Sequence, residues 1–478
     1  MRLLLIILDG WGERPAIRWN PLKQAKLPSF ELLHKGPHSL LHASGEAVGL
    51  PEGMVGNSEV GHLTLGAGRV LPTAMFRITQ SIHDKTLFAQ LDSHFKKGKR
   101  IHLMGLLSNG GVHSHIDHII PLLKHAQKQR KEVYVHLFSD GRDMPIRSAT
   151  TLFKLIMPLI KENIKLASLC GRYYAMDRDK RWERTENAYS IISAGAPISS
   201  LSVEKYLQEQ YSKGVTDEFI LPTALTKYGG ISDNDCILFW NFREDRARQL
   251  SHLFVKHHPK LAFATMTEYE KGLPVTVLFP PVHPENTLAD VLSLEGKTQL
   301  RIAETEKYAH ITYFFNGLRE SPVDEEERIL HESPKVATYD LAPAMRAYAI
   351  TRTVLEKVMD YDFVLVNFAN ADMVGHTGNM NAALLAAVTV DECIGQIMRH
   401  AQRYGYIVMI TADHGNIEQM QDEHGEPQTM HTTNKVPCFL FGKNCSLRDG
   451  GLSDIAPTIL QLFGIPKPKE MTGRSLIK

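Results

Sequence analysis

Two short segments near the C-terminus of this chain combine carboxylates with imidazoles. Residues 372–376 read DMVGH, residues 411–416 read TADHGN, and His431 follows them. Together they offer two carboxylates and three imidazoles. Oxygen and nitrogen donors of this kind could supply most of the ligands that a two-metal site requires.

Two residues near the other end of the chain could complete such a site. Asp9 directly follows the apolar run 3–8 (LLLIIL), and Ser58 lies within residues 56–62 (GNSEVGH). Metals polarise phosphate oxygens and help a hydroxyl to lose its proton. A serine beside two metals therefore suggests phosphoryl-transfer chemistry.

The three carboxylates of this set occupy equivalent places in the chain, because each follows an apolar run that has the composition of a strand. The residues are Asp9, Asp372 after 363–370, and Asp413 after 407–412. In open α/β sheets, ligands bind outside the carboxyl ends of the strands. The three carboxylates can therefore meet in one crevice.

Spacing within the two segments also fits a shared site. Asp372 and His376 are four residues apart, which places them on one face if the turn is helical. Asp413 and His414 are adjacent and need a turn to point the same way, which Gly415 permits. Mixed oxygen and nitrogen ligands suit Mn²⁺, Zn²⁺ or Fe²⁺, whereas Ca²⁺ prefers oxygen.

Each of these features alone has an ordinary structural explanation. An Asp and a His four residues apart usually lie on a solvated helix face, and a serine before a glutamate, such as Ser58, is usually a helix cap. An aspartate at a strand end is often only a turn former. The occurrence of all of them together favours a metal site.

The middle of the chain carries a second, cationic group of motifs. Residues 141–143 (GRD), 171–178 (GRYYAMDR) and 241–246 (NFREDR) each begin at the end of an apolar run. Arginine binds carboxylate and phosphate in a bidentate manner, so several converging arginines suit a small anion with several charges. Surface salt bridges are the alternative, since acidic residues are interleaved. Residues 110–115 (GGVHSH) add imidazoles that could bind a substrate oxygen or simply belong to a loop.

Composition limits the class of protein. The 478 residues favour two domains, and 43% hydrophobic with 22% charged residues is typical of a soluble globular protein. A net charge of +1 gives no general basic field for nucleic acid.

No apolar run approaches the ~20 residues of a membrane helix, and the N-terminal run predicts a buried strand rather than a signal peptide. The five cysteines include no CxxC pair, which favours reduced thiols in the cytoplasm.

Short apolar runs alternate with longer amphipathic segments, which predicts an α/β fold with mostly parallel sheets. The predicted strands are 3–8, 101–107, 133–138, 164–170, 236–242, 274–279, 310–315, 363–369, 406–412 and 436–441. The predicted helices are 116–130, 148–163, 183–194, 244–256, 343–360, 380–403 and 453–463. The charged run 324–328 (DEEER) predicts a solvated loop.

The proposed metal ligands lie at the two ends of the chain, within 9–58 and 372–431. If they converge, the residues between them contain an inserted domain. Residues 66–72 and 280–284 are rich in turn formers and are the expected hinges. We therefore predict a discontinuous metal-binding domain of residues 1–74 and 283–478, and an inserted substrate domain of residues 75–282.

Taken in order, these motifs resemble those of the 2,3-bisphosphoglycerate-independent phosphoglycerate mutases of the alkaline phosphatase superfamily. The resemblance extends over nearly the whole chain. It rests on residues 8–12 (LDGWG), 56–62, 110–115, 140–143 (DGRD), 171–178, 241–243 (NFR), 304–310 (ETEKYAH), 372–377 (DMVGHT), 411–416 and 431–433 (HTT).

The resemblance implies an alkaline-phosphatase-like metal-binding domain with an inserted α/β substrate domain. It implies two Mn²⁺ ions per chain and no 2,3-bisphosphoglycerate cofactor. By this resemblance, Ser58 is the nucleophile, and the ligands of the two ions are Asp9, Ser58, Asp413 and His414 for one, and Asp372, His376 and His431 for the other. It assigns substrate binding to His113, Arg142, Asp143, Arg172, Arg178, Arg243, Arg246 and Lys307.

The function expected from this resemblance is the interconversion of 3-phosphoglycerate and 2-phosphoglycerate in glycolysis through a phosphoserine on Ser58. Asp143 is the expected acid/base, and Lys307 neutralises phosphate charge. The expected partners are the small-molecule substrates alone, without nucleic acid or membrane, in a cytoplasmic monomer. A metal-dependent phosphohydrolase or a phosphopentomutase could share the metal ligands but need not share the arginine motifs. A metal-binding structural protein would need no nucleophile.

Overall fold

The computed structural model describes residues 1–422 and 425–478. The chain divides into two compact units. Unit 1 comprises Met1–Thr73 and His283–Lys478, and unit 2 comprises Ala74–Val282. The first junction lies one residue before the boundary expected from the sequence, and the second lies at it.

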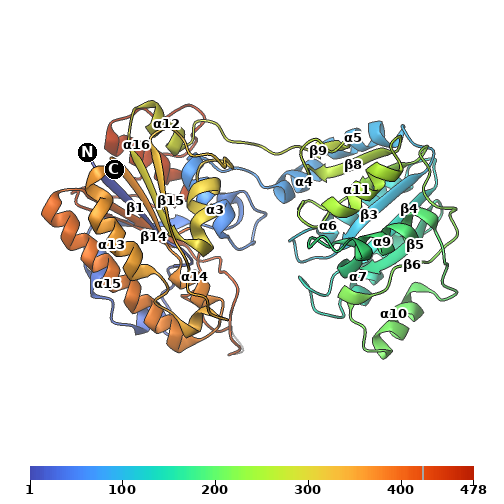
Figure 1. The fold of residues 1–478 in the computed structure, drawn as a ribbon, viewed down its shortest axis with the longest axis horizontal. Helices are drawn as coiled ribbons and strands as arrows, with labels where there is room; N and C mark the ends of the chain where they lie inside the picture. Colours follow the sequence, from blue (N-terminus) through green and yellow to red (C-terminus); the bar gives the residue numbers. More distant parts are fainter. Residues whose placement is uncertain (423–424) are drawn as a thin grey trace. The chain divides into compact units, whose positions relative to one another are not determined.

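Unit 1 is built on a mixed sheet of eight strands in the order β11-β10-β12-β1-β13-β14-β2-β15 (Figure 1). The strands from β11 to β13 are parallel, and β14 is antiparallel to both of its neighbours. All six residues of β1 are buried, as expected for a central strand covered on both faces. The strands are β1 Leu3–Leu8, β2 His38–His42, β10 Gln299–Glu304, β11 Glu326–His331, β12 Phe363–Phe368, β13 Ile407–Thr411, β14 Val436–Phe441 and β15 Gly450–Gly451.

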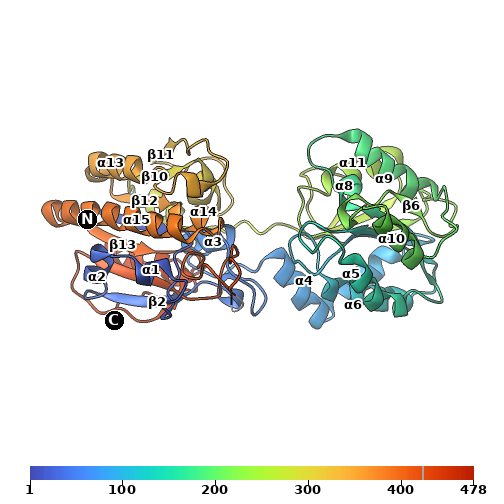
Figure 2. The same ribbon diagram turned by 90° about the horizontal axis from the view of Figure 1, so that it is seen from below.

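Helices cover both faces of this sheet (Figure 1). The two long helices α13 and α15 lie side by side in both views (Figures 1 and 2). Helix α3 packs against α16 and α12. The helices of unit 1 are α1 Pro21–Gln24, α2 Pro28–Leu33, α3 Ser58–Ala67, α12 Leu288–Leu294, α13 Ala347–Lys357, α14 Asn370–Gly375, α15 Met380–Tyr404 and α16 Ile455–Phe463.

Unit 2 has its own sheet of seven strands in the order β6-β5-β4-β3-β7-β8-β9, parallel except for β6. The strands are β3 Ile101–Leu107, β4 Val133–Ser139, β5 Ile164–Gly171, β6 Thr223–Ala224, β7 Cys236–Phe239, β8 Ala262–Thr267 and β9 Thr276–Phe279. The helices are α4 Ala74–His83, α5 Thr86–Phe95, α6 Ile116–Gln127, α7 Ala149–Ile156, α8 Arg172–Ala175, α9 Trp182–Ala194, α10 Val203–Ser212 and α11 Arg248–His257. The predicted α/β class is confirmed in both units.

One predicted strand is wrong, and its error has a physical cause. Residues 310–315 have strand-like aromatic and β-branched side chains, yet His310–Phe314 form a π-helical turn. This turn packs against α3 so closely that a Cβ on Gly66 would lie 2.0 Å from the carbonyl oxygen of Phe315. Tertiary packing thus overrides local strand preference.

Other boundaries also differ from the sequence expectations. The charged run 324–328 is not a loop throughout, because β11 begins at Glu326. This strand lies at an edge of the sheet, where charged side chains oppose pairing with another chain. Helix α7 ends at Ile156, and Pro158 follows in a 3₁₀ turn. The expected hinge at 66–72 begins inside α3, which ends at Ala67.

The cysteines and the helices of the described residues can be compared with the expectations from composition. All five cysteines are free thiols, and four of them are buried. Within the two described ranges, no helix has the length and apolar character needed to cross a membrane.

Unit 2 buries several histidines away from its strand ends. His102 of β3 and His136 of β4 contact each other through ring nitrogens 3.0 Å apart, and His136 contacts the hydroxyl of Ser168 at 2.8 Å. His118 of α6 contacts the hydroxyl of Thr79 at 2.8 Å. Burial lowers the pKa of His102, lowers that of His136 well below its ordinary value, and lowers that of His118 to about 3.

These neutral histidines predict acid sensitivity. In the unfolded chain a histidine binds a proton near pH 6.5, whereas folded His118 stays neutral down to about pH 3. The free energy of unfolding should therefore fall as the pH drops below 6.5, by up to about 2 kcal/mol for this residue at pH 5. In His118→Gln the amide can keep the contact with Thr79, so its thermal stability should depend less on pH than that of the parent.

The control for this experiment is His83→Gln, which changes an exposed histidine of the same unit. It should leave the pH dependence of the melting temperature as in the parent. Equal pH dependence in the parent and in His118→Gln would contradict the assignment.

Candidate active site

The carboxyl ends of three parallel strands bring the acidic residues of unit 1 together. Strand β1 lies between β12 and β13 and is parallel to both. Asp9 directly follows β1, Asp413 lies two residues after β13, and Asp372 lies in α14, just after β12. All three side chains are buried. The topology of the sheet therefore gathers residues that are about 400 positions apart in the chain.

Asp9, Asp413 and His414 form the first group of possible ligands, with donor atoms all within 4.8 Å of one another. Ser58 completes it as the first residue of α3, whose cap is the side chain of Asn57 rather than Ser58 itself. The Ser58 hydroxyl lies 3.0 Å from Oδ1 of Asp9 and 3.0 Å from Nε2 of His414.

Asp372, His376 and His431 form the second group, also within 4.8 Å. Helix α14 places His376 four residues after Asp372, and Nε2 of His376 lies 3.2 Å from Oδ1 of that aspartate. Nε2 of His431 lies 3.1 Å from the same oxygen and 3.1 Å from Nε2 of His376. Three donor atoms thus converge on one point.

Lys307 joins the two groups. Its ammonium donates to Oδ1 of Asp9 at 2.6 Å, to Oδ2 of Asp372 at 2.6 Å and to the Ser58 hydroxyl at 2.8 Å. Burial opposes the charge of Lys307, but Asp372 and Asp9 raise its pKa above the ordinary value. Burial alone would likewise raise the pKa of both aspartates, but the lysine holds each well below its usual range.

The imidazoles are oriented as metal ligands usually are. Nδ1 of His376 lies 2.7 Å from the carbonyl oxygen of Thr429, and Nδ1 of His431 lies 2.8 Å from that of Gly56. A hydrogen on Nδ1 satisfies each carbonyl and leaves the Nε2 lone pair directed into the site. Two such lone pairs 3.1 Å apart require a cation or a proton between them.

A buried carboxylate oxygen that accepts no hydrogen bond from the described ranges and lies 3.3 and 3.4 Å from nitrogens of His62 and His414 gives a further test of whether a cation fits. Oδ1 of Asp413 accepts from the amides of Gly10 and His414, whereas Oδ2 is buried and, among the described residues, accepts no hydrogen bond. The mixed oxygen and nitrogen donors of both groups suit a divalent transition metal. The same surroundings also favour a proton on His414. Burial would lower the pKa of His414, but Asp413 and Asp9 raise it to about 9.

Glu418, which the sequence interpretation missed, joins the segments that carry the candidate metal ligands. Its Oε2 accepts from the amides of Gly12 and Asn416, at 3.1 and 2.8 Å. Its Oε1 accepts from the hydroxyl of Thr432 and from the side-chain amide of Asn434. A Cβ on Gly12 would lie 2.3 Å from this carboxyl carbon and would push the carboxylate away from these partners. One buried carboxylate thus fixes the chain after Asp9, after His414 and after His431.

His62 and Asn367 form hydrogen bonds that hold Asp9 and Ser58 of the first group in place. The Asn367 side chain donates to Oδ2 of Asp9 at 2.8 Å and lies 3.1 Å from Nε2 of His62. Nδ1 of His62 lies 2.8 Å from the carbonyl oxygen of Ser58. These contacts hold the aspartate and the serine in one rigid network.

Unit 2 gathers its own set of predicted residues by the same topology. Strands β4, β3 and β7 are parallel neighbours, β5 continues the series, and their carboxyl ends lie at one edge of the sheet. The residues that follow these ends are Arg142, Asp143, Arg172, Arg178, Arg243 and Arg246, with His113 in the loop after β3. We call these seven residues, with Asp140 and Asp245, the arginine cluster.

Arg172 has a structural position within this cluster. Its side chain is buried and donates to Oδ1 of Asp140 at 2.7 Å and to Oδ2 of Asp143 at 2.5 Å. Asp140 also accepts from the Ser108 hydroxyl at 2.6 Å. Arg172 therefore positions Asp143 and has little freedom to reach elsewhere.

The remaining arginines are more accessible. Arg178 and Arg243 are about half exposed and share Asp245, at 3.0 and 3.5 Å. Arg142 is also half exposed, 3.5 Å from Glu218. Burial lowers the pKa of Arg246, and the nearby guanidinium groups of Arg172, Arg178 and Arg142 lower it further. The positive charge here is only partly neutralised, as expected of a site for an anion.

His113 completes the cluster. It lies 3.7 Å from Asp245 and 3.9 Å from Asp143, and burial together with Arg172 lowers its pKa to about 4. Its buried Nδ1 has no hydrogen-bond partner in the part of the chain that the structure describes. A neutral imidazole is thus available to a bound group.

Lys307 could not be found from its own residue type, but its position would have revealed it. It follows β10, which the sequence interpretation omitted; a strand predicted at 299–304 would have placed Lys307 beside the other strand-end residues. Nothing in the sequence near Glu418 marks it, because its role arises only from loops that meet in three dimensions.

The contacts of Glu418 lead to a prediction. Glu418→Gln keeps the shape but places an amide group against hydrogen-bond donors, so the free energy of unfolding should fall by about 2–3 kcal/mol. If the candidate ligands bind a divalent metal ion, the affinity for Mn²⁺ as a probe should fall roughly 10–100-fold, because the segments that carry them are no longer held together. Calorimetric titration and thermal melting of the purified protein measure both effects. Glu426→Gln, an exposed carboxylate nearby, is the control, and unchanged affinity and stability in Glu418→Gln would contradict the assigned role.

Comparison with known proteins gives one consistent family. The model of the Metalloenzyme superfamily matches residues 1–467. The chain is 48% identical to 2,3-bisphosphoglycerate-independent phosphoglycerate mutase 2 of Methanosarcina barkeri, over 99% of this chain and 98% of that protein. It is also 48% identical to the 2,3-bisphosphoglycerate-independent phosphoglycerate mutase of Clostridium botulinum, over 100% of this chain and 99% of that one.

A solved structure gives the same result. Phosphoglycerate mutase of Leishmania mexicana, determined at low cobalt concentration, aligns with a TM-score of 0.74 and 30% identity. The alignment covers 100% of this chain and 97% of that one. The chain therefore belongs to the Metalloenzyme superfamily and, within it, to the 2,3-bisphosphoglycerate-independent phosphoglycerate mutases.

Proposed function

We propose that this protein interconverts 3-phosphoglycerate and 2-phosphoglycerate through a phosphoserine on Ser58, without 2,3-bisphosphoglycerate. The names of its relatives support the reaction. The observation that carries the proposal is the surroundings of the Ser58 hydroxyl. Within 3.0 Å it has an aspartate, an imidazole and an ammonium group.

These neighbours suit a nucleophilic hydroxyl. Oδ1 of Asp9 accepts the hydrogen bond of the hydroxyl, and Lys307 stabilises the negative charge that develops on the oxygen and on the incoming phosphoryl group. Ser58 lies at the start of α3, where the helix amides favour an anion. Phosphoryl transfer to Ser58 would leave glycerate as the released group.

Two divalent metal ions complete the proposal. Asp9, Ser58, Asp413 and His414 would hold one ion, and Asp372, His376 and His431 would hold the other; we propose Mn²⁺ for both. When bound, such ions act as Lewis acids that withdraw charge from phosphate oxygens. Lys307 and Glu418 keep the ligands in place.

The arginine cluster is proposed to hold the glycerate part of the substrate. Arg178, Arg243 and Arg246 suit its carboxylate because guanidinium groups bind carboxylates in a bidentate manner. Arg142 and the neutral His113 supply further donors. Asp143, held by Arg172, is the proposed acid/base that exchanges a proton with the two glycerate hydroxyls.

The proposal extends to the cellular setting. The reaction belongs to glycolysis, and five free thiols fit a reducing compartment, so we propose a cytoplasmic enzyme. We propose that it acts as a monomer, since each chain contains every residue that the mechanism uses.

Removal of the nucleophile is the most direct test. Ser58→Ala should lose mutase activity by roughly 10⁴-fold or more and should not acquire a phosphoryl group detectable by mass spectrometry. Thr64→Val alters another buried hydroxyl of α3 and should retain activity, which controls for damage to the helix. Turnover in Ser58→Ala comparable with that of the parent would exclude Ser58 as the phosphoryl carrier.

The arginine cluster separates a mutase from a phosphohydrolase. Arg178→Gln and Arg243→Gln each remove an accessible guanidinium, so the KM for 3-phosphoglycerate should rise about 10–100-fold, the value of one charge-assisted hydrogen bond. Release of inorganic phosphate should increase relative to formation of 2-phosphoglycerate, because glycerate escapes before the phosphoryl group returns. The ratio of the two products, measured for each variant, is the readout.

The control is Arg147→Gln, which removes an arginine of unit 2 that stacks on Tyr211 instead of joining the cluster. It should keep the parental ratio. If the parent itself forms only inorganic phosphate, the protein is a phosphohydrolase; if Arg178→Gln and Arg243→Gln match the parent, the cluster does not bind substrate.

A further inference from the structure

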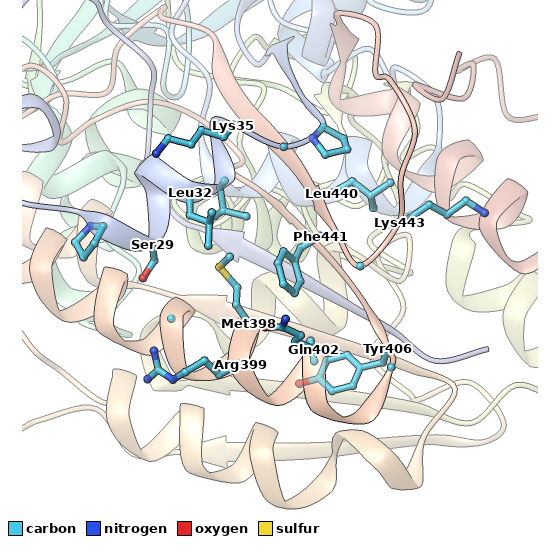
Figure 3. Close-up of a pocket in the computed structure, with 18 residues that line it drawn as sticks. Ser29, Leu32, Lys35, Met398, Arg399, Gln402, Tyr406, Leu440, Phe441 and Lys443 are labelled. Carbon is cyan, nitrogen blue, oxygen red and sulfur yellow. The ribbon is translucent and has the colours of Figure 1, made fainter.

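A groove of about 850 Å³ opens on unit 1 and contains none of the residues discussed above (Figure 3). We call it the α2–α15 groove. One wall is α2 with the turn that follows it, the other is the C-terminal half of α15, and the end of β14 closes the back. Its volume lies within the range of about 300–1,000 Å³ that is typical of small-molecule sites.

The groove lies at the amino-terminal end of β13, whereas the candidate metal ligands lie at the carboxyl-terminal ends of β13 and its neighbours. Tyr406, which lines it, directly precedes β13, whereas Asp413 follows the other end of that strand. Phe441, a second lining residue, pairs with Val408 near the start of β13. The length of a strand thus separates the groove from the candidate active site.

The groove is a consequence of how α2 is attached. Oδ1 of Asp391 on α15 accepts from the amides of Ser29 and Phe30, at 2.9 and 3.0 Å. The Ser29 hydroxyl comes so near to α15 that a Cβ on Gly395 would lie 2.7 Å from it. These contacts fix the N-terminal end of α2 on α15. Farther along, small residues such as Gly36 and Ala401 line the space and leave it unfilled.

The interior of the groove is apolar. Leu33, Met398 and Leu440 are buried beneath it, and Leu32 on α2 is 55% exposed. Figure 3 shows the side chains of Leu32, Met398 and Phe441 directed toward one another across the groove. A flexible thioether at its centre can adapt to an apolar ring or chain.

The rim is cationic and carries no acid. Lys35, Arg399 and Lys443 line the groove, and no Asp or Glu does. Among residues 1–422 and 425–478, none of these three cations forms an ion pair. The nearby carboxylate of Asp391 is engaged by two backbone amides. Three exposed cations thus surround an apolar space without compensation.

We propose that the α2–α15 groove binds a small amphipathic organic anion, with an apolar ring or chain against Leu32, Met398 and Phe441 and its acidic group beside Arg399 or a rim lysine. Apolar burial supplies affinity, and the unpaired cations select for a negative charge. A peptide or protein of general composition would not require three cations around a hollow of this size.

Two matched dyes test the proposal on the full-length protein. 1-Anilinonaphthalene-8-sulfonate carries a charge, whereas N-phenyl-1-naphthylamine has the same ring system without it. Fluorescence titrations in excess inorganic phosphate, which competes for the arginine cluster, should show one saturable site that binds the sulfonate at least about tenfold more tightly. The variant K35Q/R399Q/K443Q should remove that preference.

Leu32→Asp locates the site, because it places a negative charge on an exposed wall without disturbing the core. It should weaken binding of the sulfonate at least about tenfold. Leu385→Asp changes a leucine of α15 that is 59% exposed and outside the groove, and it should leave binding unchanged. Equal affinity for the two dyes, or no effect of Leu32→Asp, would overturn the proposal. A dimer in light scattering that Leu32→Asp dissociates would instead identify the groove as a contact between two copies.

Discussion

A single buried ammonium group makes the candidate active site possible. Lys307 contacts Asp9, Asp372 and Ser58 at once, in a part of unit 1 where three carboxylates lie out of reach of solvent. Without this cation, Asp9 and Asp372 would repel each other in a medium of low dielectric constant, and burial would raise their pKa values. The lysine lowers the pKa of Asp9 and of Asp372 and donates a hydrogen bond to the serine hydroxyl that lies beside them.

Both units place charged side chains at the carboxyl ends of parallel strands, but the predominant charge is negative in unit 1 and positive in unit 2. In each, parallel strands end side by side, and the first residues after the strands carry the functional groups. Unit 1 places acids and imidazoles there, which suits cations, whereas unit 2 places guanidinium groups there, which suits anions. The strand ends of the two sheets thus gather side chains of opposite predominant charge.

The features predicted correctly from the sequence are those that depend on the periodicity of apolar residues and on the ends of strands. The α/β class is confirmed, and the structure brings Asp9, Asp372 and Asp413 together as the alternation of apolar runs indicated. Their roles as ligands remain predictions. The strand predicted at 310–315 is wrong, because packing against α3 determines the conformation of these residues and they form a helical turn.

The contributions of Glu418, His62 and Asn367 could not be predicted for a different reason. Each acts through backbone groups and side chains that are distant in the chain, and no spacing rule marks such contacts. Arg172 is a related case, because the sequence placed it among substrate ligands, whereas its burial shows that it also holds two aspartates.

The central position of β1 has a consequence for synthesis on the ribosome. This strand is made long before its two neighbours in the sheet, β12 and β13, which begin at Phe363 and Ile407. At ~5–20 residues per second, roughly 20–80 s pass before both partners exist. During that time, the six apolar residues of β1 remain without their native strand partners and open to association with other nascent chains. The physical risk of association at β1 therefore lasts until translation has passed β13.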